Sequence, residues 1–155
     1  MGLGFFTAAR QGRKDDAELG KGLWRRAHDR FHRGLDRYHQ VLEGVEDEPL
    51  YAELVDIANQ LAELSGRVRR VCVEAQRLSP SEGLDIPHSL SGVHRALSKA
   101  GNSLAATAEA AAMLRLAVGP VPVGAASVWR RAETVFEQVA EAERLLAAAG
   151  PVPEL

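Results

Sequence analysis

The chain has 155 residues, of which 46% are hydrophobic and 26% are charged, and its formal net charge is −2. This length suits one compact domain with a substantial core, and the composition is that of a folded globular protein rather than a disordered chain. The small net charge excludes a strong bulk attraction to nucleic acid or to anionic membranes. A single cysteine, Cys72, excludes an internal disulfide framework and is typical of a reducing compartment.

The composition also bears on where the protein resides. No apolar run approaches the roughly 20 residues that a helix needs to span a bilayer. The opening MGLGFF lacks the basic segment, apolar stretch and cleavage site of a secretion signal. Arginine is far more frequent than lysine and alanine is abundant, a bias that suits a GC-rich bacterial genome. We therefore expect a protein of the bacterial cytoplasm with no membrane span.

Residues 1–18 differ from the rest of the chain because glycine interrupts them repeatedly, and glycine at this density disfavours a stable helix. We predict a flexible N-terminal tail or arm. Phe5 and Phe6 would be its apolar anchors, and the nearby bases would be attracted to an acidic partner or a lipid surface. These bases are Arg10, Arg13 and Lys14.

From residue 19 onward, apolar residues recur at alternating intervals of three and four, which only an α-helix can align on one face. No stretch shows the sustained alternation of a strand. The pattern is clearest in the seam formed by Leu50, Leu54, Ile57, Leu61, Leu64, Val68, Val71, Ala75 and Leu78. It predicts one domain over 19–150, with helices at about 19–44, 49–78, 88–118 and 126–149, and a C-terminal tail at 151–155.

The boundaries between the expected helices contain residues that begin or end helices. Asp47-Glu48-Pro49 supplies an acidic cap and a proline suited to the first turn of the second helix. The segment SPSEGLDIP (79–87) and the pair Gly119-Pro120 interrupt the chain before and after the third helix. Short joints force consecutive helices to run antiparallel. We therefore predict an all-α fold, an antiparallel up-down-up-down four-helix bundle with heptad-like core packing.

Four arginines at helical spacing form a ridge beside the apolar face of the first long helix: Arg26, Arg30, Arg33 and Arg37. The stretch from Glu46 to Glu63 carries six acids and no base. An antiparallel turn near residue 47 would bring Arg37 level with Asp56, and both Arg30 and Arg33 level with Glu63. The ridge therefore predicts ion pairs within the first hairpin or, alternatively, a surface that binds an acidic partner or phosphate.

The repeat HDRFHRGLDRYHQ (28–40) places His28, His32 and Asp36 on one arc of the same helix. Histidines four residues apart can share a metal ion, and His94 from the third helix could join them. A closed metal site needs more ligands than one helix supplies here, and the surrounding arginines oppose cation capture. We expect the histidines to be boundary residues of the core, with pH- or partner-sensitivity and metal binding as alternatives.

The third helix is rich in small residues from Ala100 to Ala112. Small side chains allow a neighbouring helix to approach closely, so this stretch predicts either a tight seam inside the bundle or the face of a homodimer.

The sequence contains no phosphate-binding loop, nucleophile elbow or other catalytic motif. We therefore expect a non-enzymatic interaction module without a cofactor, which binds a protein partner or a second copy. Its candidate surfaces are the arginines at 26, 30, 33 and 37 and the phenylalanines at 5 and 6. The alternative is a small-ligand or metal-binding bundle that uses His28, His32 and Asp36. A nucleic-acid partner is not expected, because the basic ridge lacks interleaved aromatics.

Overall fold

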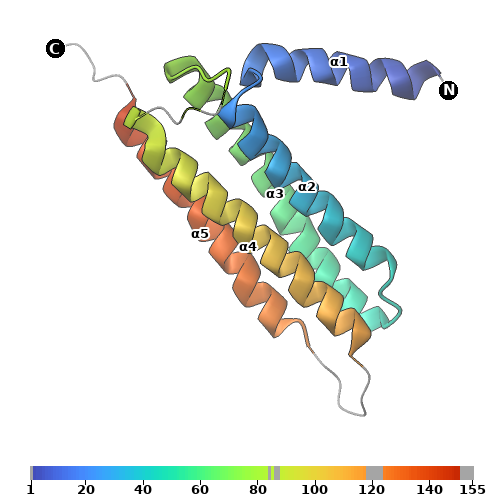
Figure 1. Ribbon diagram of the computed structural model, residues 1–155. Helices are drawn as coiled ribbons and strands as arrows, with labels where there is room; N and C mark the ends of the chain where they lie inside the picture. Colours follow the sequence, from blue (N-terminus) through green and yellow to red (C-terminus); the bar gives the residue numbers. More distant parts are fainter. Residues whose placement is uncertain (1, 84, 86–87, 118–123, 151–155) are drawn as a thin grey trace.

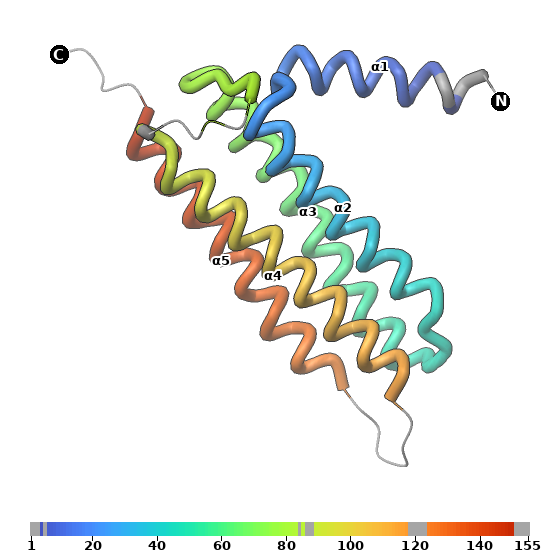
Figure 2. The backbone as a smooth tube through the Cα atoms, viewed as in Figure 1, coloured from blue at the N-terminus to red at the C-terminus, as the bar shows by residue number. Residues whose placement is uncertain are grey.

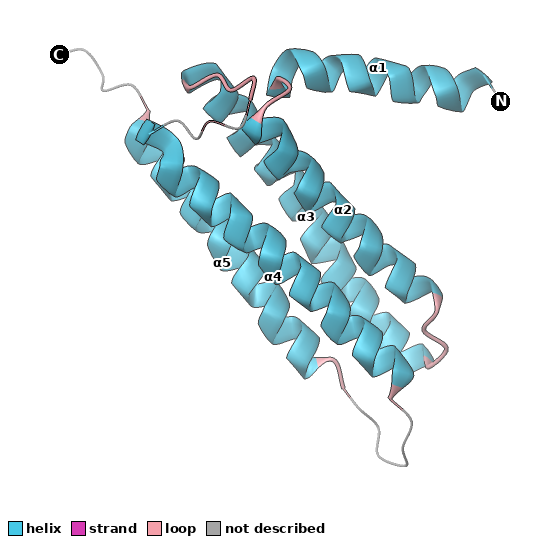
Figure 3. Ribbon diagram, in the orientation of Figure 1, coloured by secondary structure: helices cyan, strands magenta, loops and turns pink. Residues whose placement is uncertain are grey.

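A computed structural model describes residues 2–83, 85, 88–117 and 124–150 of the chain. These residues contain helices and loops but no strand, which confirms the predicted all-α class (Figure 3). None of these helices is both long enough and apolar enough to cross a membrane. The elements are α1 (Gly2–Leu19), α2 (Leu23–Glu43), α3 (Glu48–Leu78), the 3-10 helix η1 (His88–Leu90), α4 (Ser91–Leu116) and α5 (Ala126–Ala149).

Helices α2, α3, α4 and α5 lie side by side and alternate in direction, while α1 projects across one end of them (Figures 1 and 2). Helix α2 packs against α3 and α4, and α5 packs against the same two helices. Helices α3 and α4, although consecutive in the chain, therefore lie diagonally opposite each other. This order makes the parallel pair α2 and α4 direct neighbours. The polar flank of α2 that carries the arginines therefore borders α4.

The seam residues of α3 are buried along almost its whole length, from Leu50 to Ala75. Helix α5 contributes Val128, Val135 and Val139, all with no exposed surface. From α2, the Tyr38 ring is fully buried, and its hydroxyl donates a hydrogen bond to the carbonyl oxygen of Leu54 at 2.8 Å. This bond sets α2 and α3 level at residues 38 and 54, close to the register that the sequence predicts.

Several of the small residues of α4 pack within the chain. Ala100, Ala108 and Ala111 have no exposed surface. Across from them, a Cβ atom on Gly34 of α2 would lie 2.8 Å from the Leu104 side chain, so α2 and α4 approach closely at this level. These contacts fit the tight-seam interpretation for the buried residues. Ala105 is exposed and Ala106, Ala110 and Ala112 are half-buried, so the homodimer face stays a prediction.

Residues 2–18, which the sequence predicts to be a flexible tail or arm, form most of helix α1 in the structure. Two of the glycines, Gly4 and Gly12, lie within this helix with no neighbouring atoms near the position of a Cβ. Helix α1 is fixed to the bundle at its last turns, where Leu19 is fully buried. It ends at Gly20, whose φ of +70° favours glycine. The C-terminal tail predicted at 151–155 and the end of the helix predicted at 118 lie outside the described residues.

The joint between α1 and α2 packs tightly against the chain that follows α3. The backbone N–H of Leu23 donates to Ser81 Oγ at 3.1 Å, and Trp24 Nε1 donates to the carbonyl oxygen of Ser79 at 3.0 Å. A Cβ on Gly22 would lie only 2.2 Å from the carbonyl oxygen of Ser81. Only glycine at position 22 therefore permits this approach.

We predict that Gly22→Ala destabilises the fold by about 1–3 kcal/mol, because the added methyl group forces two backbones apart. Urea unfolding monitored by circular dichroism measures the change in the free energy of unfolding. The matched control is Gly12→Ala, which adds the same methyl group in open space on α1. It should be neutral or stabilising by up to about 1 kcal/mol. Equal free energies of unfolding for the two variants would show that the Gly22 contact is not required.

Candidate binding surface on α2

Helix α2 presents two sets of polar side chains on opposite flanks of its buried face. One flank carries the arginine ridge (Arg26, Arg30, Arg33 and Arg37), whose members are all exposed. The other carries His28, His32, Asp36 and His39. Successive residues of a helix are about 100° apart, so neighbours in the sequence such as Arg25 and Arg26 face different surroundings.

No member of the arginine ridge forms an ion pair with a carboxylate in the part of the chain that the structure describes. Arg26 Nη2 instead donates to the carbonyl oxygen of Gly83 at 2.6 Å, and Arg30 Nη2 donates to the side-chain oxygen of Asn102. Both acceptors are neutral. The ridge is therefore partly oriented by hydrogen bonds, but no carboxylate of the described residues forms an ion pair with it.

The predicted ion pairs of Arg37 with Asp56, and of Arg30 and Arg33 with Glu63, are absent among the described residues. The level of the two helices is as expected, but the ridge turns toward α4 rather than α3. Arg30 passes within 3.5 Å of the position of a Cβ on Gly101 of α4. The sequence predicted correctly which residues of α3 lie level with the arginines. It predicted wrongly which helix the arginines face.

A groove of ≈ 230 Å³ lies between α2 and α4 at the upper end of the ridge. Arg26 and Arg30 line it from α2, and His94 and Ser98 line it from α4. Its apolar lining consists of Leu23, Ala27 and Leu97. The groove therefore combines two uncompensated positive charges with a hydrophobic surface.

The imidazole of His94 is held against the core at one wall of this groove. Its ring meets Trp24 edge to face, with the centroids 6.1 Å apart and the planes at 73°. Burial lowers the pKa of His94 below its ordinary value, so the ring is neutral at neutral pH. A neutral imidazole can donate a hydrogen bond through one nitrogen and accept one through the other.

The predicted histidine face is only partly assembled. The rings of His28 and His32 lie 4.6 Å apart, but Asp36 is exposed, and His94 contacts Trp24 instead of joining them. His39 Nδ1 lies 2.9 Å from the carbonyl oxygen of Leu35. Among the described residues, no group of three or more histidine, cysteine, aspartate or glutamate side chains could hold a metal ion.

His28 is the buried member of that face, with 4% of its surface exposed. Its Nδ1 lies 2.9 Å from Asp29 Oδ1, while its buried Nε2 has no hydrogen-bond partner among the described residues. Burial lowers the pKa of His28, and the nearby His32 and Arg69 lower it further, whereas Asp29 opposes them. The imidazole is therefore a neutral core group, as the boundary interpretation expects.

A network of ion pairs fixes α1 to α2 and α3, and the sequence reasoning missed it. Arg25 pairs with Asp16 at 2.7 Å and with Asp29 at 3.1 Å, and Arg69 pairs with Asp15 at 2.7 Å and with Glu18 at 2.9 Å. Burial alone would raise the pKa of Asp15. The hydrogen bonds from Arg69 and Gln11 outweigh this effect and keep the pKa below its ordinary value. The cluster of three acids at the end of α1 was the available signal.

Helix α1 carries the other predicted surface. Phe6 is 66% exposed, and the backbone of Phe5 belongs to the same helix. The bases Arg10, Arg13 and Lys14 are also exposed. The residues of the predicted tail or arm thus form a projecting helix (Figure 1), and their role as a docking surface stays a prediction.

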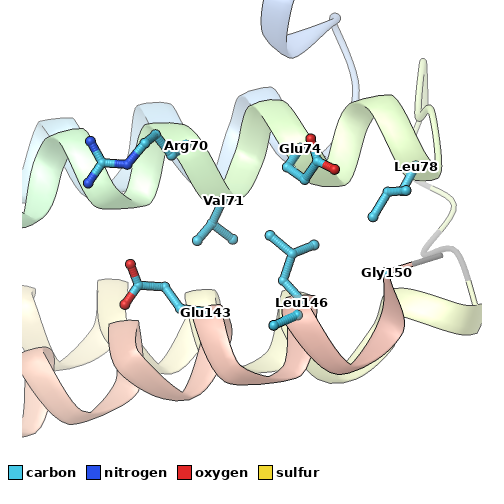
Figure 4. A pocket seen from close by; sticks show the side chains of 8 residues that line it. Arg70, Val71, Glu74, Leu78, Glu143, Leu146 and Gly150 are labelled. Atoms are coloured by element: carbon cyan, nitrogen blue, oxygen red, sulfur yellow. The ribbon is translucent and has the colours of Figure 1, made fainter. Parts of the chain in front are cut away.

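A cleft of ≈ 350 Å³ lies between the C-terminal turns of α3 and α5, and apolar side chains from the two helices project into it (Figure 4). It is lined by Arg70, Val71, Glu74, Leu78, Glu143, Leu146, Ala147 and Gly150. Its two carboxylates are already ion-paired, Glu74 with Arg77 and Glu143 with Arg67. This cleft offers apolar surface but less uncompensated charge than the groove between α2 and α4.

The single cysteine, Cys72, is fully buried in α3. Burial raises the pKa of its thiol to about 12. The thiolate, which is the reactive form, is therefore scarce at neutral pH.

Comparisons of the chain with protein-family models, with curated proteins and with solved structures found no match.

We predict that the free energy of unfolding falls as the pH drops below about 6.5. The unfolded chain then binds more protons than the folded chain, because burial lowers the folded pKa values of buried His28 and half-buried His94. Each such group contributes at most about 1.4 kcal/mol per pH unit. His28→Leu should reduce the slope between about pH 6.5 and 5, where carboxylates contribute little. Urea unfolding at several pH values in this range measures the slope of the free energy of unfolding against pH. A slope that is unchanged in His28→Leu but reduced in the control His39→Gln would contradict the assignment of this slope to His28.

Proposed function

We propose that the protein is a non-enzymatic interaction module that binds an acidic segment of a protein partner along the arginine ridge of α2. The observation that carries the proposal is the absence of carboxylate partners for the ridge within the described residues, in a chain with 21 acidic residues. A row of uncompensated guanidinium groups attracts acidic polypeptides and accelerates their association.

In this proposal α2 to α5 act as an antiparallel up-down-up-down four-helix bundle whose purpose is to hold the ridge rigid. The buried rings of Trp24 and Tyr38 fix α2 at two levels through hydrogen bonds to backbone carbonyls. A rigid helix presents its arginines without the ordering cost that a flexible segment has on binding. Helix α1, with exposed Phe6, is a second surface for the same partner.

We also propose that the protein acts in the bacterial cytoplasm. The histidine face has no part in it, because His28 is a buried neutral group beside Asp29 and Asp36 lies exposed outside it. Nucleic acid is the competing macromolecule for a basic ridge, and the test therefore separates the two.

We predict that replacing two ridge arginines, Arg33→Glu with Arg37→Glu, abolishes capture of the partner, because attraction to its acids becomes repulsion. The measurement is affinity capture from lysate with chemical cross-linking, followed by mass spectrometry of the cross-linked peptides. The wild-type chain should cross-link next to α2 with acidic segments. Capture should also weaken as ionic strength rises to about 1 M, where the Debye length is about 3 Å.

The matched control is Arg95→Glu with Arg130→Glu, which makes the same change in net charge at two exposed arginines on α4 and α5. This variant should retain the partner. If the control variant lost the partner as completely as the ridge variant, the loss would be explained by the change in net charge and not by the ridge. Cross-links from α2 to neutral or basic segments, or capture that nuclease treatment removes, would overturn the proposal.

A further inference from the structure

We infer that the groove between α2 and α4 is the anchor point of this interaction, and that it takes one carboxylate side chain together with an adjoining aliphatic residue of the acidic segment. The inference rests on the proposed function and divides the arginine ridge into two parts. Arg26 and Arg30 line the groove, whereas Arg33 and Arg37 lie beyond it along α2. The first pair would hold the partner, and the second pair would attract it.

The two guanidinium groups at the groove are oriented before any partner binds. Arg26 is tied to the carbonyl oxygen of Gly83, and Arg30 to the side chain of Asn102. A guanidinium has five N–H donors, so each arginine keeps donors for a ligand after making one such bond. Carboxylates accept parallel pairs of these bonds, which gives both affinity and direction.

The opposite wall of the groove suits the same ligand. His94 and Ser98 lie there, and both side chains can donate a hydrogen bond to an anion. The imidazole cannot swing freely, because it packs against the buried ring of Trp24. The groove therefore has donors on two sides and no carboxylate among its lining residues.

The floor explains why an aliphatic neighbour should accompany the carboxylate. Leu23, Ala27 and Leu97 give the groove an apolar surface, which a bare inorganic anion would leave uncovered. An aliphatic side chain beside the acid would bury this surface and exclude water from the ion pair. Exclusion of water strengthens the attraction between the charges.

The position of Trp24 provides a direct measurement. Trp129→Phe leaves Trp24 as the sole tryptophan of the chain, and its ring touches a wall of the groove through His94. The probe is a capped peptide of alternating glutamate and leucine, titrated at constant ionic strength in this background. We expect a saturable change in Trp24 emission. A peptide with glutamine in place of glutamate should cause no such change, and inorganic phosphate should bind at least about tenfold more weakly.

Paired variants separate anchoring from attraction. Arg26→Lys with Arg30→Lys keeps both charges but removes the forked donors, and should weaken the Glu-Leu peptide about tenfold or more, mainly through faster dissociation. Arg33→Gln with Arg37→Gln should mainly slow association and reduce its salt dependence. Stopped-flow fluorescence measures both rates, and thermal unfolding shows that each variant is folded.

Each outcome decides between the two claims. The anchor would be overturned if the two pairs of variants lost the same amount of affinity for the peptide, or if phosphate bound as tightly as the peptide. In either case the ridge would remain a binding surface. The anchor would also be overturned if the wild-type chain did not bind the peptide. The cross-linking experiment tests the ridge independently of this result. Cross-links that avoid α2 would remove the proposed function and the anchor together.

Discussion

The candidate site depends on the contact between Trp24 and the chain that follows α3. The indole is fully buried, its N–H is bonded to the carbonyl oxygen of Ser79, and its ring supports His94 of α4. One side chain thus ties the start of α2 to the end of α3 and to α4. The same segment after α3 accepts the bond from Arg26 through Gly83, so the groove and the upper end of the ridge share one support.

Glycine is what allows that support to form. At Gly22 the backbone comes so close to Ser81 that a Cβ has no room, and at Gly20 the chain takes a left-handed conformation to leave α1. The frequent glycines of the N-terminal region predict a loose tail. Glycine density alone cannot distinguish a mobile tail from a tight joint, because the residue suits both. The distinction comes from the partner segment, about 60 residues away in the chain.

The helices and their level could be predicted because a heptad pattern records which side of each helix is buried. Leu54 and Tyr38 illustrate the point, since both are buried and bonded at the expected level. The pattern does not record which helix lies on which side. Here the chain after α3 connects diagonally opposite helices, so α2 has α4 as its neighbour. That placement turned Arg30 toward Asn102 instead of Glu63, and it assembled the groove from residues that the sequence had assigned to separate features.

The contrast between Arg25 and its neighbour Arg26 indicates what the ridge contributes. Arg25 pairs with an acid of α1 and stabilises the joint. Arg26, one residue and about 100° away, pairs with no acid among the residues that the structure describes. The ridge arginines repeat at intervals of three and four, where like charges on a helix repel each other by about 0.2–0.5 kcal/mol per pair. A glutamate at either middle position would have relieved this repulsion and stabilised α2. The fold therefore retains an arrangement that costs stability, as the proposed binding surface requires.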